Sequence, residues 1–330
     1  MATISYSEVD TFRRCQQRWY YRYKQRIRRI RKHVRLLKGS ILHEMLNAHI
    51  SHKMNKKYKG DDPWDVLAGY EKEYATYFEE EREHYGDVIG DCGAIFEGYL
   101  RKYRKDPLTY EKSEVEVFFD ISDNLRFVGF IDKIAVDKNK RRWITDHKFN
   151  ERIPTAEDRF SELQLILYFW AWEKKYPDIP IDGLLWDYAK SKAPTKPDLL
   201  KSGELSQRKN LDCDPHTYLL AISEHNLDAN NYQEMLAHLE GKEETFFERV
   251  FVPKPSKDMV AIIVDDFLQT AAEIKIKRGN GKASRCTHTM TPFNCNTCEF
   301  RPVCEAEVRG HDTEFIIKSD YQQREVQETE

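Results

Sequence analysis

Hydrophobic and polar positions between residues 114 and 190 follow the patterns of strands and of one buried helix. Residues 128–136 and 143–148 are rich in β-branched and aromatic side chains, and the charged, turn-prone stretch between them predicts a β-hairpin. Residues 114–121 and 181–190 predict two further strands. Residues 159–174 are apolar almost all round, which predicts a buried helix.

The flanking parts of the chain favour helices. Residues 5–31 carry a rough apolar stripe after a capping serine, and Gly39 and Ser40 are expected to open a second helix. Residues 64–105 predict one or two helices, broken near Gly86 to Gly93.

Towards the C-terminus the pattern alternates between helices and a strand. Helices are expected around residues 218–239 and over 256–277, with a strand at 245–252 between them. Residues 191–216 lack clear periodicity and predict a loop or arm. This order of elements predicts an α/β fold with a mixed central sheet flanked by helices.

Composition narrows the class of protein. The chain has 330 residues, of which 40% are hydrophobic, as in a globular protein. The absence of a run of about 18 apolar residues argues against a membrane span, and the N-terminus lacks the pattern of a secretory signal. An odd number of cysteines, seven, then indicates reduced thiols or metal ligands rather than disulfides. We expect a cytoplasmic protein.

The net charge of −3 hides a strongly basic N-terminal segment. Twelve Lys or Arg lie between Thr11 and Lys38, and no Asp or Glu occurs between Asp10 and Glu44. Interleaved aromatics can stack on bases while arginines contact phosphates. The arginines expected to bind nucleic acid are Arg13, Arg14, Arg18, Arg22 and Arg26. The alternative is a solvated, Arg-rich amphipathic helix with an aromatic core face.

Charged residues on the predicted hairpin suggest a cation site. On its second strand Asp146 and Lys148 share a face, because side chains alternate along a strand. Asp132 lies among apolar residues of the first strand, where an unpaired charge is costly to bury. Two carboxylates beside an ammonium suggest a divalent-metal site. The alternative is a surface hairpin with a Lys–Asp ladder.

Other polar residues lie near this hairpin in the predicted fold. Glu116 can supply an additional carboxylate to the metal site, whereas Glu114 is expected to decorate the exposed face. Gln164 and Tyr168 are four residues apart on the buried helix, so they share a face and need polar partners. His43 adjoins an apolar helix face, where a lone histidine is usually a core residue.

The C-terminal part contains a dense cysteine cluster. Cys295, Cys298 and Cys304 have the spacing C-x2-C-x5-C, and Cys286 precedes them by nine residues. Closely spaced thiolates favour a soft metal, and both zinc and an iron–sulfur cluster take four of them. The fourth ligand is either Cys286 or the distant Cys15, and the spacing alone leaves both open.

Taken in order, these motifs resemble those of the RecB-like branch of the PD-(D/E)XK nuclease superfamily. The ordered set is Gly39-x3-His43, Gly129-x2-Asp132, Asp146-x-Lys148 and Gln164-x3-Tyr168. An early cysteine with a late C-x2-C-x5-C is similar to the iron–sulfur members of that branch, among them the AddB nuclease domain and the CRISPR-associated exonucleases. The resemblance covers residues 5–304 and implies a restriction-endonuclease-like core with a C-terminal cysteine-ligated cluster.

The resemblance implies a role for each matched residue. His43, Asp132 and Asp146 would hold Mg²⁺ or Mn²⁺, and Lys148 would orient or activate the attacking water. Gln164 and Tyr168 would position Lys148 and the nucleic-acid backbone. Four thiols would bind a [4Fe–4S] cluster, with structural Zn²⁺ as the alternative: Cys15, Cys295, Cys298 and Cys304. Cys286 is the alternative to Cys15 as the fourth ligand.

Three positions depart from the family pattern. Ile131 stands where a proline precedes the aspartate, and Gln16 follows Cys15 where the family often has proline, which weakens Cys15 as the fourth ligand. His147 occupies the variable position of D-x-K and points off the active face, so we expect it to have little effect.

The resemblance implies a metal-dependent DNA exonuclease of recombination, repair or replication that acts on single-stranded DNA or duplex ends and leaves 5′-phosphates. The alternative is a non-catalytic or zinc-stabilised nucleic-acid-binding protein. No G-x4-G-K-[ST] loop is present, so a helicase, recombinase or integrase partner would be a separate chain. We expect a single nuclease domain over residues 1–310, followed by a frayed polar tail (311–330). In order, the domain would comprise a basic helix (1–38), a helical layer (39–110), a catalytic core (111–190), a loop or arm (191–216), helices and a strand (217–285) and a cysteine cluster (286–310).

Overall fold

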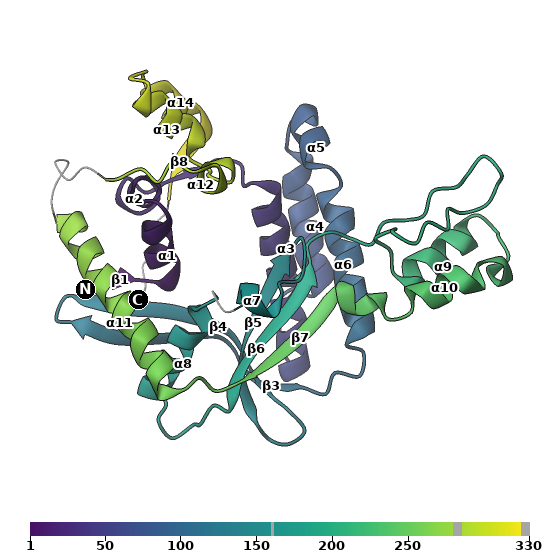
Figure 1. The fold of residues 1–330 in the computed structure, drawn as a ribbon, viewed down its shortest axis with the longest axis horizontal. Helices are drawn as coiled ribbons and strands as arrows, with labels where there is room; N and C mark the ends of the chain where they lie inside the picture. Colours follow the sequence, from purple (N-terminus) through teal and green to yellow (C-terminus); the bar gives the residue numbers. More distant parts are fainter. Residues whose placement is uncertain (160–161, 280–285, 325–330) are drawn as a thin grey trace.

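The computed structural model describes residues 1–159, 162–279 and 286–324. Within these ranges the centre of the molecule is a six-stranded mixed sheet (Figure 1). Its strands are β1 (Ala2–Ile4), β3 (Thr109–Ser122), β4 (Leu125–Val136), β5 (Arg142–Asn150), β6 (Gly183–Lys190) and β7 (Phe247–Pro253). The order is β1-β4-β5-β6-β7, and β3 pairs with β4. The pairs β1–β4 and β5–β6 are parallel and the others antiparallel, which confirms the predicted mixed sheet.

The predicted hairpin is formed by β4 and β5. These strands pair antiparallel from Lys133–Thr145 to Val136–Arg142. The turn between them is closed by Asp137, whose Oδ1 accepts hydrogen bonds from the N–H groups of Asn139 and Arg141. The strands predicted at 114–121, 181–190 and 245–252 correspond to β3, β6 and β7, and β6 and β7 each begin two residues later than predicted.

Helices cover both faces of the sheet (Figure 1). One face packs against α1 (Tyr6–Arg14), α8 (Gln164–Lys175) and α11 (Lys257–Gly279), in a core that contains Phe127, Ile144 and Phe267. The other face packs against α3 (Val34–Met54), α4 (Pro63–Ala75) and α6 (Val88–Lys102), around Phe96 and Phe247. The predicted buried helix is shorter than expected, because α7 (Ala156–Arg159) is separate and residues 160–161 lie outside the described ranges.

The N-terminal basic segment is not the single helix that was predicted for residues 5–31. Ser5 caps α1 as expected, but Cys15 has an extended backbone (φ −165°, ψ 116°) that ends the helix. The chain continues as α2 (Gln16–Trp19), the π-helical turn η1 (Tyr20–Lys24) and the strand β2 (Ile27–Arg29). Tertiary contacts decide this break, since the Cys15 N–H still reaches Thr11 O while its Sγ faces the C-terminal region.

The second helix begins earlier than predicted. The His33 Nδ1 atom caps α3 by accepting a hydrogen bond from the Arg35 N–H, so Gly39 lies inside the helix rather than at its start. The stretch 64–105 forms three helices, α4, α5 (Glu79–Tyr85) and α6. Gly86 ends α5 at φ 71°, as the predicted break near this glycine requires, whereas Gly93 lies within α6.

A small lobe projects from one side of the molecule (Figure 1). It follows the predicted loop 191–216 and contains α9 (Pro215–Glu224), the 3₁₀ turn η2 (Ala229–Tyr232) and α10 (Gln233–Leu239), so the helix expected over 218–239 is divided. A separate core around Cys213, Tyr218 and Leu239 stabilises the lobe. A second 3₁₀ turn, η3 (Lys242–Thr245), leads back to β7.

The C-terminal region packs on the N-terminal segment. It comprises α12 (Pro292–Asn296), α13 (Arg301–Val308), α14 (Glu314–Asp320) and β8 (Tyr321–Gln323), and β8 pairs antiparallel with β2. The prediction of a frayed tail is therefore wrong for residues 311–324: Tyr321 is buried and its ring stacks on Phe300. Residues 280–285 and 325–330, which belong to the predicted segments 217–285 and 311–330, lie outside the described ranges. No helix in the described part of the chain is long and apolar enough to cross a membrane.

Candidate active site and metal centre

The candidate site lies at a gap along one edge of β4. β3 pairs with β4 along one edge from Leu125 to Val136, so β1 and β5 must share the other edge. β1 pairs with residues as far as Phe127, and β5 pairs from Lys133 onward. Among the described strands none pairs with this edge between those two residues. Asp132 lies at the end of the gap, where its side chain can approach groups from other elements.

Asp132 is held by one main-chain and one side-chain donor. The His147 N–H donates to its Oδ2 atom at 2.8 Å, and His43 Nε2 lies 3.2 Å from its Oδ1 atom. Burial by itself disfavours the charged carboxylate, but the hydrogen bond and charge of His43 outweigh burial and lower the pKa of Asp132 to about 2. The bond to Asp132 in turn raises the pKa of His43.

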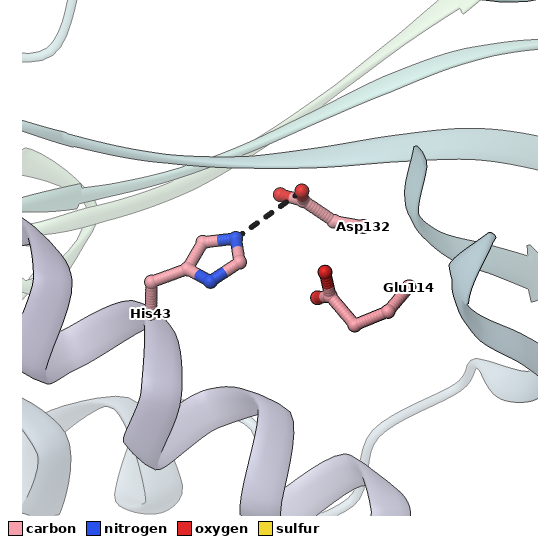
Figure 2. Close-up of side chains that lie close together, drawn as sticks. All are labelled: His43, Glu114 and Asp132. Atoms are coloured by element: carbon pink, nitrogen blue, oxygen red, sulfur yellow. Dashed lines mark ion pairs between the residues drawn. The ribbon is translucent and has the colours of Figure 1, made fainter. Parts of the chain in front are cut away.

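Glu114 completes a group of three potential ligands with His43 and Asp132. Their ligand atoms lie within 4.8 Å of one another, and Figure 2 shows the three side chains converging from α3, β3 and β4. Glu114 lies opposite Asp132 in the register between Ser113–Lys133 and Val115–Ile131. Its φ of 48° turns this residue out of the regular strand. The structure therefore brings Glu114 to this group, and Glu116, which the sequence favoured, is not part of it.

Asp146, Lys148, Gln164 and Tyr168 form a connected chain on the face covered by α8. Lys148 Nζ lies 2.8 Å from Asp146 Oδ2 and donates to Gln164 Oε1 at 3.0 Å. The Gln164 Nε2 atom donates to Tyr168 OH at 2.7 Å. The two polar groups of the buried helix thus find the partners that their burial requires.

Burial and neighbouring charges together set the pKa values of Asp146 and Lys148. Burial raises the pKa of Asp146, although Lys148 opposes the shift, and the negative charge of Asp132 raises it further. For Lys148, burial favours the neutral amine, but the charge of Asp146 outweighs it and raises the pKa. Lys148 is therefore a cation at neutral pH. The effect of the Asp132 charge on the pKa of Asp146 is the one expected of two carboxylates that share a cation site.

Gly129 makes room for Tyr168. A Cβ atom built on this glycine would lie 2.5 Å from the Tyr168 ring, closer than carbon atoms tolerate. Gly129 also lies on the part of the β4 edge with which neither β1 nor β5 pairs. The Gly129-x2-Asp132 spacing thus combines a close helix contact with the ligand three residues later.

Asp146 and Lys148 open into a cavity of about 530 Å³. Helix α1 contributes Tyr6, Asp10 and Arg14 to its wall, and α8 contributes Gln164. Further lining comes from the end of β5, the loop after it and β6: Phe149, Asn150, Glu151, Arg152 and Trp186. Basic, acidic and aromatic groups thus surround the end of the Lys148 side chain.

The donor set fits a hard divalent cation. Carboxylate oxygens and an imidazole nitrogen are the atoms that Mg²⁺ and Mn²⁺ take from proteins. Asp146 Oδ2 is buried and has an ionic contact with Lys148, but it has no donor in hydrogen-bond geometry within the described residues. A cation beside this oxygen would satisfy it. His43, Glu114 and Asp132 could hold the ion, whereas Asp146, which was predicted with His43 and Asp132, is not part of their group and could complete the site from the adjacent strand β5.

Four of the seven cysteines line a second cavity, of about 180 Å³: Cys15, Cys295, Cys298 and Cys304. Cys286 is buried in the main hydrophobic core and does not line this cavity. The extended backbone at Cys15 ends α1 at this point, and the Cys15 Sγ accepts a hydrogen bond from the Thr289 N–H. The break in the predicted basic helix thus brings an N-terminal thiol to three C-terminal ones.

The arginines predicted to meet phosphates have different environments: Arg13, Arg14, Arg18, Arg22 and Arg26. Arg13 donates to Thr270 and to the Asp266 carbonyl on α11, so it ties α1 to that helix. Arg22 pairs with Glu299 at 3.6 Å, and Arg18 lines the cysteine cavity. Arg14 lines both cavities and Arg26 is exposed. The structure thus places only part of this set on open surface.

A comparison with protein families identifies the chain. The family model described as the PD-(D/E)XK nuclease superfamily matches residues 3–305. The chain belongs to the PD-(D/E)XK nuclease superfamily. No curated protein matches it. Among solved structures it is similar to the crystal structure of SSO0001, with 12% identity and a TM-score of 0.30, over 82% of this chain and 96% of that chain.

Membership of this superfamily confirms the expected class of enzyme, a nuclease, and the mixed α/β core agrees with its restriction-endonuclease-like fold. Two residues beside the site were missed from the sequence. Glu114 was assigned to the exposed face, and Lys133 next to Asp132 was not considered. Lys133 could have been found as a second charge, next to Asp132, in an otherwise apolar strand, where burial demands partners.

Proposed function

We propose that the chain is a Mg²⁺- or Mn²⁺-dependent DNA exonuclease that leaves 5′-phosphates. The observation that carries this proposal is that His43, Glu114 and Asp132 bring ligand atoms within 4.8 Å of one another, while Asp132 accepts the N–H of His147, the residue between Asp146 and Lys148 on β5. When bound, the divalent cation would polarise the scissile phosphate and lower the pKa of a water molecule. His43, Glu114, Asp132 and Asp146 would hold it.

The residues around the cation have separate roles in this proposal. The Lys148 ammonium complements negative charge that develops on the phosphate. Gln164 fixes the position of Nζ by accepting its hydrogen bond, and Tyr168 fixes Gln164. Lys148 reaches the 530 Å³ cavity, so a phosphate entering there meets its charge.

The walls of this cavity favour single strands or frayed duplex ends as substrates. Helix α1 contributes Tyr6 and Arg14 to one side, so an unpaired base and its phosphate would meet an aromatic ring and a cation there. Tyr6 and Phe149 offer rings for stacking, and Arg14 offers a cation for the backbone. We infer that residues 1–310 act as one nuclease domain, with any helicase, recombinase or integrase on a separate chain, in recombination, repair or replication.

We also propose that Cys15, Cys295, Cys298 and Cys304 hold a [4Fe–4S] cluster. In the described residues no three thiols have their sulfur atoms within 4.8 Å of one another. Tetrahedral zinc with Zn–S bonds of about 2.3 Å would need sulfurs about 3.8 Å apart. The four thiols line a cavity of about 180 Å³, which favours a cofactor larger than a single zinc ion. The RecB-like branch is thus the proposed place of the chain within the superfamily.

End-labelled DNA tests the proposed activity. Single-stranded and duplex substrates, blocked at the 5′ or 3′ end, are incubated with the full chain and Mg²⁺ or Mn²⁺. We expect stepwise release of 5′-phosphorylated nucleotides from one end. Lys148→Ala should reduce the rate about 10²–10³-fold, and Asp146→Ala at least as much. Lys138→Ala, in the exposed hairpin turn, is the matched control and should retain activity. Equal rates in all three variants would exclude this active site.

A further inference from the structure

Lys133 is a fully buried lysine beside the proposed metal site. It follows Asp132 on β4, and its side chain is 1% exposed. Its Nζ atom donates to Asn47 Oδ1 and to Ser113 Oγ, each at 2.7 Å, and lies 3.5 Å from Glu114 Oε1. Burying an ammonium is costly unless such partners compensate it, so these contacts define one position for the side chain.

The three contacts join the two elements that carry His43 and Glu114. Asn47 lies one helical turn after His43 on α3, so both side chains leave the same face of that helix. Ser113 precedes Glu114 on β3, and its hydroxyl donates to Asn47 Oδ1 at 2.7 Å. Lys133 thus holds α3 and β3 together immediately beside the converging ligands.

Each carboxylate of the site also contacts one cationic or protonatable side chain. Asp132 contacts His43, Asp146 contacts Lys148, and Glu114 contacts Lys133. The two lysines differ in access: the Lys148 side chain is 29% exposed and opens into the cavity, whereas Lys133 has no route to a substrate. A role for Lys133 must therefore act through its neighbours.

We propose that Lys133 is a positioning residue of the metal site, which fixes Glu114 and the face of α3 that carries His43. This inference rests on the proposed function, because it takes His43, Glu114 and Asp132 as ligands of the cation. Groups that orient metal ligands commonly change metal affinity by about 10–100-fold when they are removed. A purely electrostatic effect has the opposite sign, since loss of a nearby positive charge strengthens cation binding.

Calorimetric titration of the full chain with Mn²⁺ separates these effects. In Lys133→Met, of similar length but without charge, we expect the Kd for Mn²⁺ to rise about tenfold. Asn47→Ala keeps the ammonium but removes a contact, and we expect a rise of about threefold or more. Lys112→Met removes the same charge from an exposed position on β3 and is the control, with a Kd within about twofold of the wild type.

Each outcome decides the inference. An unchanged or lower Kd in Lys133→Met would overturn it, and if that variant does not fold, Asn47→Ala decides by the same criterion. Nuclease assays run in parallel separate the two proposals. A wild-type chain that binds Mn²⁺ without cleaving DNA would refute the proposed function and leave this inference standing, whereas a chain that binds no Mn²⁺ would refute both.

Discussion

The main-chain N–H of His147 donates a 2.8 Å hydrogen bond to the carboxylate of Asp132. The β4–β5 ladder ends at Lys133–Thr145, two residues before His147, so this carboxylate takes the place of a main-chain carbonyl. Beyond that point β5 continues to pair with β6 as far as Asn150. The divergence of β4 from β5 thus creates the space for the site, and one amide connects its two sides.

The His147 side chain lies on the opposite face of the sheet. Its Nδ1 atom is 3.4 Å from Asp187 Oδ2, and both side chains are almost fully buried. His147, Asp187 and Arg249 are direct neighbours across β5, β6 and β7. Where the sequence suggested little effect for His147, the structure buries its ring beside Asp187 at the point where β5 leaves β4, and neither ring nitrogen has a hydrogen-bond partner among the described residues.

His147→Phe tests the contact with Asp187. The variant keeps the volume of the ring but loses the contact with Asp187, so we expect the Asp132 amide contact to loosen and kcat on DNA to fall about tenfold. His147→Asn, which retains a side-chain N–H near the position of Nδ1, should recover most of the activity. Thr145→Val, on the same buried face, is the control, and an equal kcat for it and His147→Phe would contradict the role.

Arg249→Met should destabilise the fold. The Arg249 guanidinium donates to Asp187 at 3.1 Å and to Asp106 at 2.6 Å, and all three side chains are buried. Removing it takes the buried counter-charge from both carboxylates and leaves Asp106 with only the more exposed Lys53 at 3.2 Å, which costs about 3–5 kcal/mol. Urea denaturation at pH 7 measures the loss. Arg141→Met, which breaks an exposed pair with Asp137, should cost less than about 1 kcal/mol.

The same variant should change how stability depends on pH. Burial favours protonated Asp106 and Asp187, but Arg249 outweighs it and lowers the pKa of both, with Tyr99 and His147 as further partners of Asp187. In the wild type the two ionised acids therefore contribute to the free energy of unfolding at neutral pH. This contribution is lost only as the pH falls through their lowered pKa values. Without Arg249, burial raises the pKa of both acids, so stability should increase from pH 7 to pH 5. A parallel fall in both proteins would contradict this.

Gly129→Ala should disturb the active site without entering it. The added methyl group would meet the Tyr168 ring, which must move and take Gln164 and Lys148 with it. Because small misplacements of reacting groups are costly, we expect kcat to fall about 10–100-fold while the Kd for Mn²⁺ changes little. Tyr168→Phe in the same background separates the steric effect from loss of the hydroxyl. Full activity in Gly129→Ala would show that the close contact is not needed.

Cysteine variants test the second cavity. Cys15→Ser should remove the broad absorbance near 400 nm of an iron–sulfur protein and lower the Tm, because one of four proposed ligands is lost. Cys286→Ser should retain the absorbance, since Cys286 packs in the hydrophobic core and does not line the cavity. Metal analysis of the purified chain supplies the check. Stoichiometric zinc in a colourless protein, or loss of colour only in Cys286→Ser, would overturn the assignment.

Local periodicity made part of the site predictable. Side chains alternate along a strand, so the shared face of Asp146 and Lys148 follows from the sequence alone. The four-residue spacing of Gln164 and Tyr168 likewise places both on one face of α8. The hairpin follows from two apolar runs around a polar turn, and the spacing of the late cysteines brings three thiols together. Each of these features depends on residues close in the chain.

Only the tertiary structure decided which distant groups meet. Glu114 replaces Glu116 because its positive φ interrupts the alternation of β3, which no hydrophobic pattern reveals. Cys15 reaches the late cysteines because α1 ends there, and Arg13 is used in packing on α11 rather than on open surface. His43 and Asp132 meet because α3 docks beside the gap in β4. Such contacts depend on strand register and helix docking, which the whole core determines together.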